Sequence, residues 1–297
     1  MLIQPDCISC ILKMAITAIR KITTDEEVIR DLTVRILTIP ALQGKQWDLP
    51  SPEVIEQVME MISETFGTAD PFSSLKQEQN RIALALYPAL QKMVRESPDP
   101  LPTAVKMAIM GNAIDLMVTD RLPDLENLVR RELRQPLPEE ALAAFLNKLA
   151  QARTLVYLGD NAGEIVFDKL LLETLTAVSS PQVTFVVRRV PALNDATRLE
   201  AEMAGLDQVA AVMDNGLAAP VPGTVWSRCS AELRRKIGEA DLVISKGGGN
   251  FDTLEGEKGV RTDISFLLLS KCVPYNHYFK TEMYRPVLAN FFQEKKN

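Results

Sequence analysis

Polar side chains suited to binding a metal ion or a phosphate follow four short apolar runs in the second half of the chain. The segments after these runs are 159–164, 188–197, 214–216 and 246–252. Asp160 and Asn161 come directly after the first run, and Asp195 follows the second. Mg²⁺ and Mn²⁺ prefer carboxylate and amide oxygens as ligands. These three side chains could therefore supply three of about six ligands and leave room for water and a substrate oxygen.

Lys246 and the glycines after it form the last of these segments. A lysine offers a point charge for a phosphate. Gly247, Gly248 and Gly249 let backbone N–H groups approach an anion without side chains in the way, and Asn250 ends the run. A metal, a lysine and backbone donors together stabilise a phosphoryl group during its transfer. The segment therefore indicates phosphoryl-transfer chemistry.

Each motif also has a purely structural interpretation. An Asp-Asn pair after a strand often forms a turn, and so does the segment 214–216. The segment Asn194 to Thr197 is equally typical of a helix N-cap. The functional interpretation depends on several such segments meeting at one edge of a sheet.

The elements that must position these residues alternate between strand and helix. We predict strands at 154–158, 183–187, 209–213 and 242–245, with helices near 164–178, 194–204 and 227–239. This alternation predicts a parallel sheet covered on both faces, in which ligands bind beyond the carboxyl ends of the strands. We therefore expect an α/β fold, with a mostly parallel, Rossmann-like three-layer αβα domain over 151–297.

Residues 1–150 show helical periodicity throughout and no alternating strand pattern. Breaks rich in proline divide them into about six or seven predicted helices. We expect a helical bundle or cap domain over 1–150 beside the α/β catalytic domain.

The composition excludes several classes of protein. With 46% hydrophobic and 24% charged residues, the chain has the values of a globular protein. A net charge of −6 argues against a general nucleic-acid binder. No apolar run reaches the roughly 18 residues of a membrane helix, and the N-terminus lacks the pattern of a secretory signal. We expect a cytoplasmic protein with no membrane partner.

Cys7 and Cys10 form a Cys-x-x-Cys pair with three possible roles. It could be half of a second metal site, with partners among Cys229, Cys272 or another chain. It could be redox-active at a helix N-terminus, or it could be two reduced thiols packed on a helix. His277, the only histidine, is expected to be structural.

Several motifs in this order resemble the damage-control phosphatase family, long known as a domain of unknown function. They are Gly159 to Glu164, Asn194 to Thr197, Ser245 to Phe251 and Leu267 to Cys272, with Asp70-Pro71-Phe72, Lys76, Asn80 and Gly111-Asn112-x-x-Asp115 in the helical half. The chain length and the Cys-x-x-Cys pair resemble the stand-alone prokaryotic branch. The resemblance covers nearly the whole chain.

The resemblance implies a metal-dependent phosphatase that acts on small phosphate esters with Mn²⁺, Co²⁺, Ni²⁺ or Mg²⁺. Sugar phosphates, nucleotides and damaged phosphometabolites are the candidate substrates. The family's metal ligands fall on Asp160, Asn161 and Asp195, and its phosphate loop falls on 246–250. Its second lysine falls on Lys271, and Glu164 matches an acidic position near the substrate.

The mechanism stays open at this level. We expect Asp160, Asp195 and Lys246 to be catalytic, with an aspartate acting as nucleophile or positioning a water. Asn112 and Asp115 either bind the sugar or base of the substrate or pack a helix on the sheet.

Two other classes remain as alternatives. A methyltransferase using S-adenosylmethionine, or a dinucleotide enzyme, would share the Rossmann-like pattern, although the first strand's loop lacks Gly-x-Gly-x-x-Gly. A non-catalytic protein that binds sugar phosphates or nucleotides would share the ligand set. The sequence does not fix the physiological substrate or the oligomeric state.

Overall fold

The computed structural model describes residues 1–293 apart from 69, 113–129, 131–132 and 135. Its centre is a six-stranded sheet with the strand order β3-β2-β1-β4-β5-β6. The strands are β1 (Thr154–Leu158), β2 (Gln182–Val187), β3 (Ala211–Asp214), β4 (Leu242–Lys246), β5 (Ile264–Leu269) and β6 (Pro286–Phe291). The first five strands run parallel, and β6 pairs antiparallel with β5. The predicted α/β class with a mostly parallel sheet is confirmed.

The sequence did not predict β5 or β6. The run from Ile264 to Leu269 is buried at every position, so its side chains show no alternation of apolar and polar residues. A short apolar run of this kind does not distinguish a strand from a buried helical segment. The edge strand β6 carries only two fully buried residues, Val287 and Leu288.

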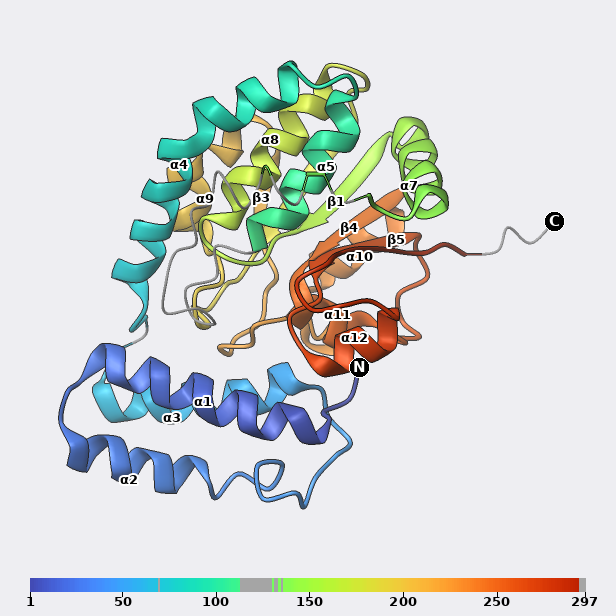
Figure 1. The fold of residues 1–297 in the computed structure, drawn as a ribbon. Coiled ribbons are helices and arrows are strands. Elements are labelled where there is room, and N and C mark those ends of the chain that lie inside the picture. Colours follow the sequence, from blue (N-terminus) through green and yellow to red (C-terminus); the bar gives the residue numbers. More distant parts are fainter. Residues whose placement is uncertain (69, 113–129, 131–132, 135, 294–297) are drawn as a thin grey trace.

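Helices cover both faces of the sheet (Figure 1). Leu155 and Tyr157 of β1 belong to one hydrophobic cluster, together with α4 (Ser73–Arg95), α5 (Pro100–Gly111) and α8 (Glu164–Thr176). Val156 and Leu158 belong to the opposite cluster, together with α10 (Ala231–Glu239) and α11 (Gly247–Leu254). Successive strand residues point to opposite faces, which explains the split. The remaining helices include α7 (Glu139–Gln151), α9 (Arg198–Ala204) and α12 (Val273–Phe279).

The first three helices form a separate cluster below the sheet in Figure 1. They are α1 (Pro5–Ile22), α2 (Glu26–Ile36) and α3 (Ser51–Phe66), and we call them the α1–α3 unit. Their buried side chains pack mainly on one another. By contrast, α4, α5 and α7 share the core of the sheet. The division into domains at residue 150 stays a prediction, and the packing favours a boundary between α3 and α4.

No helix in the described parts of the chain is both long and apolar enough to cross a bilayer.

Candidate functional site

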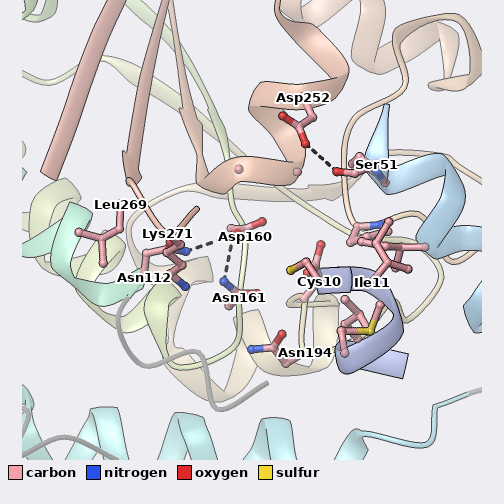
Figure 2. A pocket seen from close by; sticks show the side chains of 18 of the residues that line it. Cys10, Ile11, Ser51, Asn112, Asp160, Asn161, Asn194, Asp252, Leu269 and Lys271 are labelled. Carbon is pink, nitrogen blue, oxygen red and sulfur yellow. Dashed lines mark hydrogen bonds between the residues drawn. The ribbon is translucent and has the colours of Figure 1, made fainter. Parts of the chain in front are cut away.

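A cavity of about 210 Å³ lies between the carboxyl edge of the sheet and the α1–α3 unit (Figure 2). Seven residues that the sequence predicted for the site line it, namely Asn112, Asp160, Asn161, Asp195, Gly248, Gly249 and Lys271. The strands β1 and β4 are neighbours in the sheet. From β1 the chain continues to β2, toward one edge of the sheet, and from β4 it continues to β5, toward the other edge. Such a switch point opens a crevice at the strand ends, where open α/β sheets bind ligands.

Three side chains hold the Asp160 carboxylate in the cavity. Its Oδ2 accepts hydrogen bonds from Asn161 Nδ2 at 2.9 Å and from Asn112 Nδ2 at 3.3 Å. Its Oδ1 lies 3.4 Å from Arg188 Nη2. Burial raises the pKa of Asp160 well above its usual range, and the negative charges of Asp195 and Glu164 raise it further. Acidic groups held this close together favour a bound cation.

Asp195 is fixed by Arg188, which the sequence did not assign to the site. Arg188 Nε donates to Asp195 Oδ2 at 2.6 Å, and the guanidinium is buried. Its Nη1 donates to Asn250 Oδ1 at 3.0 Å. The sequence feature that could have identified Arg188 as a site residue is its position directly after β2, at the same edge of the sheet as Asp160.

Backbone hydrogen bonds hold the loops after β1 and β2 together. Ala196 N donates to Asp160 O and Ala162 N donates to Asn194 O, both at 2.8 Å. Leu193 has a positive φ of 49°, which costs a residue with a Cβ on the order of 1 kcal/mol. That strained conformation lies directly before Asn194 and Asp195, and it puts the Leu193 side chain on the cavity wall.

The glycine run that the sequence predicts to be a loop is instead the first turn of α11. Each glycine allows a close approach that a larger residue would block. A Cβ on Gly247 would overlap the Asp160 carboxylate, and one on Gly249 would overlap the carbonyl oxygen of Pro222. Gly247 also has a positive φ of 74°, which favours glycine. The start of α11 thus packs directly against the Asp160 carboxylate.

Lys246 does not reach the cavity. Its Nζ donates to Glu164 and Asp168 at 2.6 Å each and to the carbonyl oxygen of Ala108 at 2.7 Å. An ammonium has three N–H groups, so all of them are used. Strand alternation explains the direction, because Lys246 shares a face with Ile244, beneath α5 and α8. Lys271, after β5, is the lysine that lines the cavity.

Glu164 also lies behind the cavity rather than in its lining. It is fully buried, and its Oε2 accepts from Asn112 Nδ2 at 2.6 Å and from Asn161 Nδ2 at 3.1 Å. The Lys246–Glu164 pair therefore orients two amides that contact Asp160. Asn250 is similarly internal, with its Nδ2 donating to the Gly159 and Lys246 carbonyl oxygens.

Asp115, predicted to bind substrate, lies outside the described residues. Asp252 lines the cavity and was not predicted. Burial raises its pKa to about 6, while hydrogen bonds from Ser51 Oγ at 2.7 Å and from Tyr275 Oη at 3.0 Å oppose that rise. It joins α11 to α3, a contact between distant segments that no local pattern signals.

The cysteine pair lies near the cavity without a disulfide. Cys10 is exposed and lines the cavity, whereas Cys7 is half-buried and does not line it. Burial raises the pKa of Cys7, and that of Cys272 to about 12, so both thiols are protonated near neutral pH. The metal and redox roles of Cys7 and Cys10 stay predictions.

The donor set at the sheet edge fits a hard divalent cation. Asn161 directs its amide nitrogen to Asp160 and Glu164, which leaves Oδ1 as its ligand atom. Asp160 and Asp195 add carboxylate oxygens, the type that Mg²⁺ and Mn²⁺ prefer. No group of three or more His, Cys, Asp or Glu residues suited to a metal occurs in the described chain. The set proposed here has two carboxylates and takes its third ligand from an amide.

Fold and site together define a class, an α/β protein with an acidic, metal-suited site at the switch point of its sheet. A family model described as the damage-control phosphatase ARMT1-like domain matches residues 3–285. The chain therefore belongs to this family, and the resemblance inferred from its motifs is confirmed.

Individual relatives match most of the chain. An uncharacterized protein of Methanocaldococcus jannaschii is 31% identical over 288 residues, which cover 92% of this chain and 90% of that protein. A protein of Archaeoglobus fulgidus named damage-control phosphatase is 30% identical over 278 residues, covering 92% and 94%. The crystal structure of a duf89 family protein from Pyrococcus horikoshii matches with a TM-score of 0.83 at 26% identity, covering 97% of this chain and 98% of that one.

Proposed function

We propose that the protein is a metal-dependent phosphatase that hydrolyses monoesters of small phosphorylated metabolites, damaged ones among them. The observation that carries the proposal is the convergence of Asp160, Asn161 and Asp195 on one cavity, with Lys271 beside Asp160 (Figure 2). Oxygen ligands for a cation and a separate positive charge are the groups that a phosphate ester requires. The family membership and the name of the Archaeoglobus relative support the same activity.

In this proposal each side chain has a defined task. Asp160, Asn161 and Asp195 would hold a divalent cation, which neutralises phosphate charge when bound. Lys271 supplies a second positive charge, and N–H groups at the start of α11 donate to phosphate oxygens. Arg188 fixes Asp195 through its 2.6 Å hydrogen bond.

The nucleophile follows from these tasks. Asp160 and Asp195 are both assigned to the cation, and both are held by Arg188. A carboxylate held in this way is poorly placed to attack phosphorus, so attack by a water that an aspartate orients fits better. Lys246 acts behind this centre, by holding Glu164, rather than on the substrate.

The finer assignments are expectations from the sequence. Mn²⁺, Co²⁺, Ni²⁺ and Mg²⁺ are the candidate cations, and a cytoplasmic location stays a prediction. No feature of the described residues favours a methyltransferase, and turnover separates a phosphatase from a non-catalytic protein that binds the same phosphates.

The test is phosphate release from sugar phosphates, nucleotides and p-nitrophenyl phosphate, with each of the four cations and with EDTA. Asp160→Ala is compared with Asp207→Ala, a change at an exposed aspartate that does not line the cavity. We expect release that requires a cation, disappears in Asp160→Ala and persists in Asp207→Ala. Release that is unaffected by EDTA and by Asp160→Ala would contradict the proposal.

A further inference from the structure

The cavity has a second wall of a different chemical character from the sheet edge. Six residues of the α1–α3 unit line it. Two are polar, Cys10 and Ser51, and the Ser51 hydroxyl is taken up by its hydrogen bond to Asp252. The other four are Ile11 and Met14 of α1 and Pro52 and Ile55 of α3. These four are apolar, and Figure 2 shows Ile11 across the cavity from Asp160 and Lys271. We call these four residues the apolar wall.

Leu193 is a fifth apolar side chain in the cavity lining and packs with the α1–α3 unit. It belongs to the hydrophobic cluster of the α1–α3 unit although it lies in the loop after β2. Its positive φ of 49° is a conformation that leucine rarely adopts. Strained conformations of this kind cluster at sites that bind ligands.

Packing and polar contacts position the apolar wall against the sheet. Ile11 and Pro52 are buried, so their positions are set by the packing of the α1–α3 unit. At the start of α3, Ser51 Oγ donates to Asp252 Oδ2 at 2.7 Å. Further along α3, Glu56 accepts from Arg228 Nη1 at 2.7 Å. A ligand that enters the cavity therefore meets a preformed apolar surface.

We propose that this wall selects phosphate monoesters whose carbon skeleton is aliphatic over sugar phosphates. The inference rests on the proposed function for the position of the phosphate, at the sheet edge beside Lys271. The rest of the substrate then lies against Ile11, Met14 and Ile55, where each methylene gains from leaving water. Sugar hydroxyls placed there would lose hydrogen bonds to water without finding partners on the wall.

The test uses binding, so that it does not depend on turnover. Linear alkyl phosphonates of one to six carbons are titrated calorimetrically into the protein in the presence of Mn²⁺. The wild type is compared with Met14→Gln and Ile55→Thr. Lys13→Gln serves as the matched control, because Lys13 is exposed on α1 beside Met14 and does not line the cavity.

For the wild type and Lys13→Gln, we expect the dissociation constant to fall by roughly 3-fold to 4-fold for each methylene that reaches the wall. In Met14→Gln and Ile55→Thr this length dependence should weaken, while methyl phosphonate binds as in the wild type. A wild type with no length dependence, or with no phosphonate binding, would overturn the proposal. So would length dependence that both wall variants retain.

Turnover separates this inference from the proposed function. Phosphate release from hexyl phosphate and from glucose 6-phosphate is measured with the same four proteins. If binding depends on chain length but no phosphate is released, the proposed phosphatase activity is contradicted and the proposed role of the apolar wall is retained. If glucose 6-phosphate releases phosphate as fast as hexyl phosphate or faster, the proposed selectivity is overturned and the proposed phosphatase activity is retained.

Discussion

The two sides of the cavity differ in how they are built. The sheet edge holds buried charges, each tied to several partners, as Asp160 is tied to Asn112, Asn161 and Arg188. The α1–α3 unit faces it with apolar side chains and is joined to it by a few polar contacts, such as Ser51 with Asp252. We infer from this difference that the reaction takes place at the sheet edge and that the α1–α3 unit selects the organic part of the substrate.

The largest effect on stability is expected at Lys246, behind the sheet edge. Lys246→Met leaves the fully buried Glu164 and Asp168 without their cation. Removing one partner of a buried ion pair costs about 3–5 kcal/mol, so the free energy of unfolding should fall by that amount. Urea denaturation measures it, with Lys258→Gln, an exposed lysine, as the control.

A double variant sharpens this prediction. Lys246→Met combined with Asp168→Asn removes one of the stranded carboxylates and should recover part of the loss. If Lys246→Met alone unfolds as the wild type does, the internal role assigned to Lys246 is wrong.

The largest effect on activity is expected at Asp160. Asp160→Asn keeps the shape and removes the charge that we assign to the cation. We expect kcat/KM to fall by about 100-fold to 1000-fold, the range for removing one group that stabilises charge in a transition state. Initial rates at saturating Mn²⁺ test this, with Asp207→Asn as the control. A loss below about 3-fold would refute the assignment of Asp160 to the cation.

Asp252, where the two regions meet, should make stability depend on pH. Its pKa in the folded protein is about 6, above the unfolded value of about 3.9, because the carboxyl is buried. The folded state therefore holds this proton more tightly, so the associated stability is complete below about pH 4 and is lost as the pH rises through 6.

Asp252→Asn removes this dependence, and asparagine retains groups that can bond to Ser51 and Tyr275. Between pH 4 and 6 the variant should gain stability relative to the wild type by about 1 kcal/mol for each pH unit. Urea denaturation at pH 4, 5, 6 and 7 measures the difference. If the free energies of unfolding of the two proteins change in parallel with pH, Asp252 does not titrate in this range.

The smallest effect is expected at the contact between Glu56 and Arg228. Arg228 is 38% exposed, so solvent screens this ion pair although Glu56 is nearly buried. Arg228→Gln should lower the free energy of unfolding by about 1 kcal/mol or less. Arg235→Gln, in an exposed pair on α10, gives the baseline in the same denaturation experiment. A loss of several kcal/mol would mean that this contact, rather than the packing, holds the α1–α3 unit.

Much of the site could be predicted because it follows from strand order. Asp160, Asn161 and Asp195 come directly after or shortly beyond buried strands, and parallel strands end at one edge. The sequence prediction put Lys246 in the phosphate site because it ended the strand at residue 245. In the structure Lys246 is the last residue of β4. Its side chain therefore follows strand alternation to the α5 and α8 face, a signal that the sequence did contain.

Other features depend on contacts that no local pattern encodes. Arg188, in the loop after β2, reaches Asp160 because that loop pairs with the loop after β1. The apolar wall comes from helices more than 100 residues before Asp160 in the chain. Their periodic apolar residues predict helices, but not which side chains face the cavity.

The most direct test compares two variants on two esters. It asks whether the reaction depends on the sheet edge and substrate selection on the apolar wall. Initial rates with Mn²⁺ are measured for wild type, Asp160→Asn and Met14→Gln on methyl phosphate and on hexyl phosphate. The account predicts that Asp160→Asn lowers both rates by the same large factor, whereas Met14→Gln lowers only the rate on hexyl phosphate. Equal losses on both esters in Met14→Gln, or a loss confined to one ester in Asp160→Asn, would contradict it.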